Sequence, residues 1–318
     1  MQNIKKRGEM SLLYYGGKVV WSVLRFIFLV EMAFIVLYPF IYMLSMAIRA
    51  PEDMYDMSIV WVPKHFTLDN FKTLFEHLNY ESALFNTAII SVGCSLLQMV
   101  VCAMAGYSIG RFKSKGSGLL FGLVILTILI PPQLTNLPNY ILLSDFDFFG
   151  IITAITGSGT GINLLDQYPT IYLVAALGQG IRSGMAILIF TQYFKGIPDE
   201  LEQAAMIDGC GYFKTYTRIM VPNAGAPSLI VFILSMVWYW CDYYTMVTYF
   251  TNIRTLSVNL SDIKTALQTV FQTEAYSPYK IVTVEQAACV LCILPILILF
   301  LILQKKFVNS IINSGLVG

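Results

Sequence analysis

Long runs of apolar residues, separated by short polar stretches, are the main pattern of this chain. Six runs are long enough to cross a bilayer as a helix, which takes about 20 residues. They cover residues 24–48, 83–109, 118–142, 169–195, 224–250 and 284–304. This pattern predicts an all-α integral membrane protein with six transmembrane helices. Pro39, Pro131 and Pro295 lie within the runs and predict kinks, which membrane helices tolerate.

The composition supports a membrane class. Of the 318 residues, 57% are hydrophobic and 12% are charged, whereas soluble domains carry about 25% charged residues. So few charges could not cover the surface of a chain of this size in water, so the solvent must be lipid. The net charge of +1 gives no indication of nucleic-acid binding, and the two histidines and scattered cysteines predict no metal centre.

The distribution of positive charges indicates the orientation. Cytoplasmic loops of membrane proteins carry an excess of lysine and arginine. The short loop 111–118 contains Arg111, Lys113 and Lys115, and both ends of the chain are also basic. We therefore expect both termini to be cytoplasmic, which leaves the polar stretches 49–82, 143–168 and 251–283 on the outer side.

A polar loop between the fourth and fifth runs concentrates acidic residues. Residues 198–211, PDELEQAAMIDGCG, begin with Pro198, which favours a helix start with acidic residues in its first turn. Leu201 and Ala204 belong to a small apolar stripe, and Gly209 permits a left-handed helix end. From these residues alone, a helix that docks on a partner and a loop that lies on the lipid headgroups are equally good interpretations.

A longer stretch carries a family resemblance. The sequence ELEQAAMIDGCGYFKTYTRIMVPNAGAP resembles the EAA signature of ABC importer permeases in the carbohydrate-uptake branch, and departs from it at Gln203, Cys210 and Val221. The stretches YPFIYMLSMAIR, FTLDNFKTLF, FNTAIISV and AGYSIGRFKSKG resemble other parts of the same family. The tail QKKFVNSIINSGLVG is similar to that of the maltose-type inner-membrane permease. The resemblance covers nearly the whole chain and implies the type I ABC importer permease fold.

The resemblance also implies a division of the chain. Residues 1–82 would form a cytoplasmic arm, the first transmembrane helix and an outer loop. Residues 83–304 would form a five-helix permease core that contains the coupling loop 198–222, and residues 305–318 a cytoplasmic tail. In the family, the EAA helix sits in a cleft of an ATPase subunit and passes its movement to the membrane helices. This role is expected here for Glu200, Glu202, Ala204, Ala205, Asp208, Gly209, Ile219 and Pro222. We expect Glu202 to pair with a basic residue of the ATPase.

The implied assembly lies in the cytoplasmic membrane of a bacterium. It comprises this chain, a second homologous permease that is expected to be a different chain, two ATPase subunits and an extracellular sugar-binding protein. The chain has no GxxxxGK[ST] phosphate-binding loop, so ATP and Mg²⁺ would bind to the partner ATPases. We expect no enzyme activity, cofactor or metal in this chain, membrane lipid around it, and no nucleic-acid partner.

The fifth run contains an aromatic cluster around one carboxylate. Aromatic rings stack on the C–H faces of sugars, and a carboxylate accepts hydrogen bonds from sugar hydroxyls. A charge within a span is costly, so its default interpretation is functional. The candidate substrate-path residues are Trp238, Trp240, Cys241, Asp242, Tyr243 and Thr245. Helical spacing predicts that Trp238, Asp242 and Thr245 share one face. The alternative is an ordinary aromatic belt at the outer interface.

The C-terminal tail has an apolar periodicity. Phe307, Val308, Ile311 and Ile312 recur at intervals of three and four residues, which predicts one apolar face of a short helix. The resemblance implies that this face docks in the groove between the two ATPase subunits. The alternative is a frayed terminus.

Three other functions are alternatives for such a membrane chain. An ion-driven secondary carrier would need buried charges on several spans and an inverted repeat, but only Glu31, Arg182 and Asp242 are candidate buried charges, and no repeat is evident. An intramembrane enzyme would need a nucleophile with a base, or a metal set. An ABC permease for a non-sugar solute is the remaining alternative. The sequence leaves open which sugar would be carried.

Overall fold

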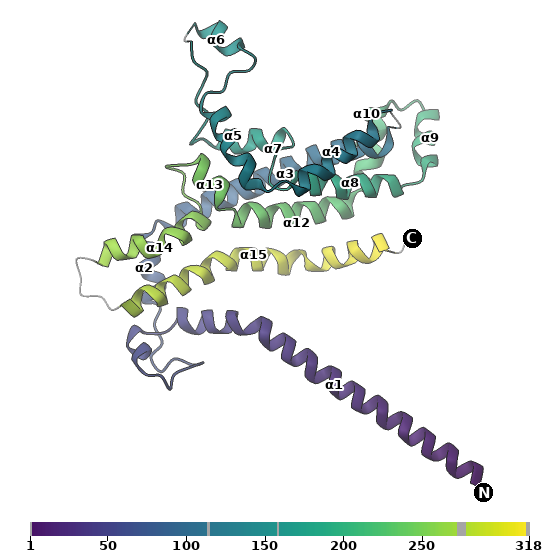
Figure 1. Ribbon diagram of the computed structural model, residues 1–318, viewed down its shortest axis with the longest axis vertical. Helices are drawn as coiled ribbons and strands as arrows, with labels where there is room; N and C mark the ends of the chain where they lie inside the picture. Colours follow the sequence, from purple (N-terminus) through teal and green to yellow (C-terminus); the bar gives the residue numbers. More distant parts are fainter. Residues whose placement is uncertain (1, 113–114, 158, 272–277, 316–318) are drawn as a thin grey trace. The chain divides into compact units, whose positions relative to one another are not determined.

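The protein is built from helices. The computed structural model describes residues 2–112, 115–157, 159–271 and 278–315, and within these ranges it contains no β-strand (Figure 1). Two isolated antiparallel bridges occur there, one between Arg49 and Phe66 and one between Phe146 and Ile162. The predicted all-α class is confirmed for the described residues.

The helices have the following bounds. The first part of the chain forms α1 (Gln2–Ala47), the 3₁₀ helix η1 (Pro51–Tyr55), α2 (Asp69–His77), α3 (Tyr80–Arg111), α4 (Ser117–Leu129), α5 (Pro132–Ser144) and α6 (Ile151–Thr156). The middle part forms α7 (Tyr168–Ala176), α8 (Ser183–Gly196), α9 (Asp199–Ile207), α10 (Tyr212–Thr215), the π-helix η2 (Tyr216–Met220) and α11 (Val221–Asn223). The last part forms α12 (Gly225–Cys241), α13 (Tyr244–Tyr249), α14 (Leu256–Phe271) and α15 (Pro278–Gly315).

The chain divides into two compact units. The N-terminal unit comprises residues 1–74 and 267–291, and the core unit comprises residues 75–266 and 292–318. In the N-terminal unit, buried polar side chains tie the segment after α1 together. The guanidinium of Arg49 donates hydrogen bonds to the carbonyl oxygens of Ile59 and Val60, at 3.1 and 3.0 Å. This segment is therefore a defined structure rather than a free loop.

Three described helices are long and apolar enough to cross a membrane unaided. They cover Gly17–Ala47, Tyr80–Arg111 and Tyr279–Lys305. Two further pairs of helices pass the same test together but are bent, α4 with α5 by 100° and the segment Tyr212–Asn223 with α12 by 76°. Counting each bent pair as one span gives up to five spans in the described part of the chain.

The predicted kink at Pro131 is a complete break between two helices in the structure. Helix α4 ends at Leu129, and α5 begins at Pro132 after Pro131, whose backbone is extended. Proline has no N–H to donate and disfavours a helical conformation in the residue before it, so two successive prolines end the first helix. The run 118–142 is therefore two helices and not one continuous helix.

Two other predicted spans are also interrupted, which the apolar pattern did not reveal. The run 169–195 was expected to be one helix, but residues 177–182 separate α7 from α8. Gly178 and Arg182 in this break have φ angles of +74° and +54°, a left-handed conformation that no helix contains. The run 224–250 was also expected to be continuous, but α12 ends at Cys241, and Asp242 is extended.

Helix α3 is the centre of the core unit. It packs against α7, α8 and α12, and Figure 1 shows α3, α8 and α12 running beside one another. The packing with α8 is close because α3 presents glycine there. A Cβ atom added at Gly106 would lie 2.5 Å from the Cβ atom of Phe190 and 2.9 Å from the backbone nitrogen of Thr191. Small residues allow membrane helices to approach in this way, and van der Waals packing then holds them together.

Candidate functional site

The acidic loop forms the short helix that its pattern predicts. Helix α9 begins at Asp199, directly after Pro198, and carries three acidic residues in its first turn. It ends in a Schellman arrangement. The amide of Cys210 donates to the carbonyl of Ala205 at 2.9 Å, and Gly209 has a φ angle of +82°. The predicted left-handed glycine is confirmed, and it fixes where the chain turns away from α9.

The apolar residues of α9 do not all lie on one buried face, as the predicted apolar stripe would require. Ala205 is only 4% exposed and packs into the core unit, whereas Leu201 and Ile207 are 45% and 86% exposed. Ala204 is exposed as well. The stripe is therefore divided, because Ala205 seats the helix on its own chain while Leu201, Ala204 and Ile207 remain on the surface. Glu200 and Asp208 are also exposed, so the outer face of α9 combines acidic and apolar side chains.

The guanidinium of Arg111, the last residue of α3, lies at the start of α9. Its side chain is only 4% exposed. Nε donates to Oε2 of Glu202 at 2.9 Å, and Nη1 lies 2.9 Å from Oδ1 of Asp199. Nη1 and Nη2 also donate to the carbonyl oxygens of Ile197 and Pro198, at 2.8 and 3.3 Å. One side chain therefore holds two carboxylates and two carbonyls.

Glu202 has its partners within the same chain. In addition to Arg111, the hydroxyl of Tyr107 donates to Oε1 of Glu202 at 2.6 Å. The Glu202 side chain is only 14% exposed. Both carboxylate oxygens are thus engaged by α3, which speaks against the expected pairing of Glu202 with a basic residue of an ATPase, and that pairing stays a prediction.

The segment after α9 contains the two remaining coupling candidates. Ile219 lies in the π-helix η2, and Pro222 is an exposed residue of α11. The carbonyl of Ile219 accepts a hydrogen bond of 2.8 Å from the side-chain amide of Asn223. Pro222 cannot donate a backbone hydrogen bond to the preceding turn, because proline has no amide hydrogen. The π-helix η2 directly before it belongs to a class of short segments that is frequent at functional sites. Tyr216 and Met220 point into the core and anchor this segment.

The six substrate-path candidates do not form one cluster. Because α12 ends at Cys241, helical spacing does not extend to Asp242 or Thr245, and the prediction that these two share a helix face with Trp238 is wrong. Trp240 is buried and donates from its indole Nε1 to the carbonyl of Cys292 at 3.0 Å. Trp240 therefore packs against α15, and its place in a substrate path stays a prediction.

Asp242 and Thr245 do lie together. The amide of Thr245 approaches Oδ1 of Asp242 at 3.5 Å. The other carboxylate oxygen, Oδ2, is buried and has no hydrogen-bond partner among the described residues. Cys241 is exposed, and the ring of Tyr243 packs edge-on against the ring of Tyr244 at 5.6 Å. A buried carboxylate oxygen without a donor is a costly arrangement that a polar cargo or water could relieve.

Trp238 has a partner that the sequence pattern did not reveal. The guanidinium carbon of Arg182 lies 5.2 Å from the centre of the Trp238 ring, within the range of a cation–π contact. The sequence predicts a buried charge at Arg182, within a continuous helical run. The structure instead puts it at the end of the break between α7 and α8, where its side chain is exposed.

The break itself is held by side chains of neighbouring helices. The amide nitrogen of Ile181 donates to the hydroxyl of Tyr239 at 3.2 Å, and the carbonyl of Ile181 accepts from Nε2 of Gln98 at 2.9 Å. Non-helical backbone at membrane depth is tolerated only where such partners or water satisfy it. The sequence signal that could have predicted this break is the pair Gly178 and Gly180 within an apolar run. Glycine interruptions of this kind mark broken helices, which often form binding sites in transporters.

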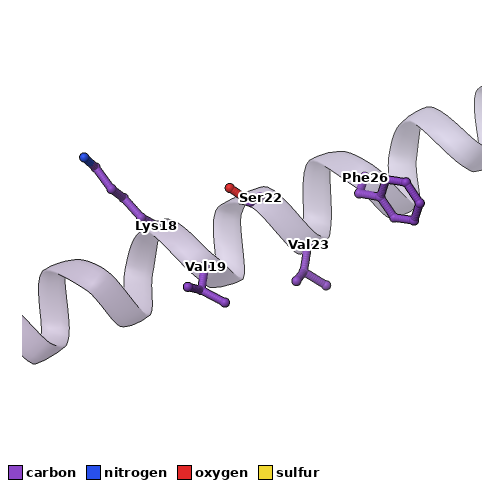
Figure 2. Close-up of a pocket in the computed structure, with 5 residues that line it drawn as sticks. All are labelled: Lys18, Val19, Ser22, Val23 and Phe26. Carbon is purple, nitrogen blue, oxygen red and sulfur yellow. The ribbon is translucent and has the colours of Figure 1, made fainter.

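The described residues offer neither a converging pocket nor a metal site elsewhere. A shallow hollow is lined by residues of α1 alone (Figure 2), namely Lys18, Val19, Ser22, Val23 and Phe26. A hollow on one helix has no groups that converge on a ligand. No group of three His, Cys, Asp or Glu side chains in the described ranges could hold a metal ion. Helix α15 continues to Gly315, but the side chains of Phe307, Val308, Ile311 and Ile312 lie outside the described residues.

Comparison with known proteins decides the family. Residues 103–313 match the family model described as the binding-protein-dependent transport system inner membrane component. The chain belongs to this family. It is therefore a multi-pass transport subunit of the cytoplasmic membrane and not an enzyme. The predicted resemblance to ABC importer permeases is confirmed.

Known proteins are similar to this permease over most of its length. It is 29% identical over 255 residues to the probable starch degradation products transport system permease protein AmyC of Thermoanaerobacterium thermosulfurigenes, covering 80% of this chain and 82% of that protein. It is 26% identical to the maltodextrin transport system permease protein MdxG of Bacillus subtilis, covering 95% and 98%. The crystal structure of a bacterial ABC transporter involved in the import of alginate matches with a TM-score of 0.68 at 18% identity, covering 91% and 96%. The structural match to this alginate transporter establishes the ABC importer permease fold.

Proposed function

We propose that this permease is a membrane-spanning subunit of an ATP-driven importer of oligosaccharides, and that it forms the translocation path together with a second, related permease. The named cargoes of its relatives, starch degradation products and maltodextrin, support the sugar assignment. Two ATPase subunits would bind ATP and Mg²⁺, and an extracellular sugar-binding protein would deliver the cargo. The family description, which refers to binding-protein-dependent transport, supports this set of partners.

The proposed topology has six crossings with both termini in the cytoplasm. They would be made by α1, α3, the bent pair α4 and α5, the pair α7 and α8, α12, and α15. The basic loop 111–118 supports the orientation. In this topology α9 is cytoplasmic, residues 1–82 carry the first crossing and an outer loop, residues 83–304 form the core, and residues 305–318 form a cytoplasmic tail.

The observation that carries the proposal is the outer face of α9. This helix is firmly seated on its own chain through Ala205 and Arg111, yet it leaves Leu201, Ala204 and Ile207 exposed. A helix of nine residues that is held so firmly, and that keeps an exposed apolar face, is suited to dock into a groove of a partner. We propose that the partner is the ATPase, and that the tail residues 307–312 add a second contact.

A direct test uses the complex from its own membrane. The tagged permease is purified in mild detergent, its co-purifying subunits are identified by mass spectrometry, and the complex is reconstituted into vesicles. We expect an ATPase subunit, ATP-dependent oligosaccharide uptake and hydrolysis that the binding protein and sugar stimulate. Uptake that follows an ion gradient without an ATPase would overturn the proposal in favour of a secondary carrier. ATP-dependent uptake of non-sugar solutes only would overturn the cargo assignment.

Gly209 offers a test of the coupling role. No atom lies within 4 Å of a Cβ added at Gly209, so a substitution there acts through its positive φ angle alone. Asparagine tolerates this conformation, alanine less so, and a β-branched residue is the least tolerant. Sugar-stimulated ATP hydrolysis should therefore decrease in the order Gly209→Asn, Gly209→Ala, Gly209→Val.

The matched control is Gly211→Ala. Gly211 also has no atom within 4 Å of an added Cβ, but its φ angle is −74°, which any residue adopts. The coupling role of α9 is wrong if Gly209→Val assembles and keeps full sugar-stimulated hydrolysis. Deletion of residues 307–318 tests the tail in the same assay, since unchanged assembly and uptake would remove it from the coupling surface.

A further inference from the structure

Arg111 joins two parts of the core unit that lie far apart in the sequence. It ends α3, whereas its partners Ile197, Pro198, Asp199 and Glu202 form the junction between α8 and α9. A guanidinium presents its donors in a planar fork, which can hold several acceptors in one geometry. Here the fork contacts the carbonyls at the end of α8 and the carboxylates in the first turn of α9 at once.

The burial of this contact distinguishes it from an ordinary surface ion pair. Exposed pairs are screened by water and contribute little, but the side chains of Arg111 and Glu202 are 4% and 14% exposed. The hydroxyl of Tyr107, one turn earlier on α3, holds the second oxygen of Glu202. The carboxylate is therefore fixed from two directions, and both of its partners are on α3.

Helix α3 can carry movement into the rest of the core. Along its length it packs on α7, α8 and α12, and Gln98 reaches from it to the break at Ile181. Helix α9 is joined through the backbone only to α8 and to the segment that leads into α12. The hydrogen bonds from Arg111 and Tyr107 to Glu202 therefore join α9 directly to α3, and Arg111 alone also contacts Asp199 and the carbonyls at the end of α8.

We propose that Arg111 is the joint through which a displacement of α9 enters α3, and that Tyr107 positions Glu202 for it. The fork makes the start of α9 and the cytoplasmic end of α3 one mechanical unit. When a partner pulls on α9, α3 moves with it and shifts the helices that contact the break. This inference rests on the proposed docking of α9 with an ATPase.

The test replaces the fork and retains the charge. In Arg111→Lys a single ammonium group cannot hold two carboxylates and two carbonyls in the same geometry. The intact complex with its ATPase subunits is reconstituted into vesicles, and both ATP hydrolysis and oligosaccharide uptake are measured. We expect Arg111→Lys to assemble and hydrolyse ATP, with uptake per ATP lowered about threefold or more, as for the loss of charge-assisted hydrogen bonds. Arg254→Lys, outside this contact, is the matched control.

A second pair of variants distinguishes a contact that transmits movement from a contact that only stabilises the fold, which is called a brace below. Tyr107→Phe and Glu202→Gln each remove part of the contact and should lower uptake per ATP. The double variant Arg111→Lys with Glu202→Gln should be no worse than the more severe single variant, because residues in one network are non-additive. A brace would instead lower the amount of assembled complex and leave uptake per ATP unchanged in the part that assembles.

The outcomes are decisive in each case. Normal uptake per ATP in assembled Arg111→Lys overturns the proposal that Arg111 transmits a displacement of α9 to α3. If Arg111→Lys does not assemble, normal uptake per ATP in Tyr107→Phe overturns it, and reduced uptake per ATP supports it. If Gly209→Val uncouples the complex while the Arg111 and Tyr107 variants do not, only the joint is wrong. If none of these variants uncouples the complex, the proposed docking of α9 is wrong as well.

Discussion

The side-chain amide of Gln98 donates a hydrogen bond of 2.9 Å to the carbonyl oxygen of Ile181. Gln98 is fully buried on α3, and Ile181 lies in the break between α7 and α8. A carbonyl that leaves a helix inside a membrane has no water to bond, so it needs a donor from the protein. Together with the hydrogen bond from the amide of Ile181 to the hydroxyl of Tyr239, this contact allows α7 and α8 to form two helices within one apolar run.

Replacing Gln98 with leucine should destabilise the permease. Gln98→Leu retains the approximate side-chain volume but leaves the carbonyl of Ile181 without its donor. We expect a loss of about 1 kcal/mol, since interhelical hydrogen bonds in membranes average roughly 0.6 and reach about 1.7 kcal/mol. The midpoint of thermal unfolding of the purified complex should fall. Gln133→Leu, at an exposed position of α5, is the control, and equal midpoints for the two variants would contradict the role of Gln98.

A methyl group at Gly106 should separate α3 from α8. The added Cβ would lie 2.5 Å from the Cβ atom of Phe190, so one helix has to shift. Overpacking of this kind costs about 1–3 kcal/mol, against a gain of about 1 kcal/mol from the helix propensity of alanine. Gly106→Ala should therefore be less stable than Gly122→Ala, where the added atom has no neighbour within 4 Å. The contrary order of unfolding midpoints would show that the two helices are not held at this distance.

The aromatic segment can be tested residue by residue. If the sugar path includes Trp238 and Asp242, then Trp238→Ala and Asp242→Asn should lower uptake several-fold while assembly and ATP hydrolysis persist, because stacking on a ring contributes about 0.5–1.5 kcal/mol. Trp240→Phe should lower stability instead, since it removes the hydrogen bond to Cys292. Uptake by vesicles, measured with several oligosaccharides, separates these effects.

Tyr244→Phe is the control for the aromatic segment. Tyr244 is 58% exposed and lies on α13, beyond the end of α12, so we expect the loss of its hydroxyl to change uptake little. Full uptake by both Trp238→Ala and Asp242→Asn would leave these residues as an interfacial aromatic belt.

The N-terminal unit contains an acid-sensitive contact. Burial opposes the ionisation of Asp53, but hydrogen bonds from His65 and Lys64 outweigh this and hold the pKa of Asp53 below its usual value. A lowered pKa in the folded state stabilises the segment fully above the unfolded value of about 3.9, and this contribution is lost as the pH falls through the folded pKa. Hydrogen exchange of residues 51–65 should therefore accelerate below about pH 4.

Substitution isolates this effect at neutral pH. Asp53→Asn removes the charged acceptor, so residues 51–65 should exchange faster at pH 7 as well. Glu52→Gln, at the exposed neighbouring position, should leave exchange unchanged. Equal protection in the two variants would mean that Asp53 does not hold this segment.

Local signals in the sequence were enough to predict several elements. Apolar runs predicted the long helices α1, α3 and α15. Pro198 and Gly209 predicted both ends of α9, because a fixed φ angle and a left-handed turn are properties of single residues. Pro131 predicted a kink for the same reason, at the place where the structure has the break between α4 and α5. These features depend on residues close in sequence, so one sequence suffices to locate them.

The features that escaped prediction depend on distant partners. The break at residues 177–182 lies in an apolar run and requires Gln98 and Tyr239, which come from other helices. The pairing of Glu202 with Arg111 joins residues 91 positions apart. Both residues lie in polar stretches, where a pattern of charges gives no information about which side chains meet. The end of α12 at Cys241 was missed because the aromatic run continues past it.

The break between α7 and α8 also bears on how the ribosome delivers this chain to the membrane. Helix α7 has nine residues and α8 has fourteen, so neither reaches the roughly 20 residues that cross a bilayer. Gln98 is synthesised before the break and Tyr239 after it. When α7 and α8 leave the translocon, α3 can already supply a donor for the carbonyl of Ile181, whereas the acceptor for its amide arrives only with α12. In the order of synthesis, α3 thus precedes the broken pair with the donor for the carbonyl of Ile181, and α12 follows it with the acceptor for the amide.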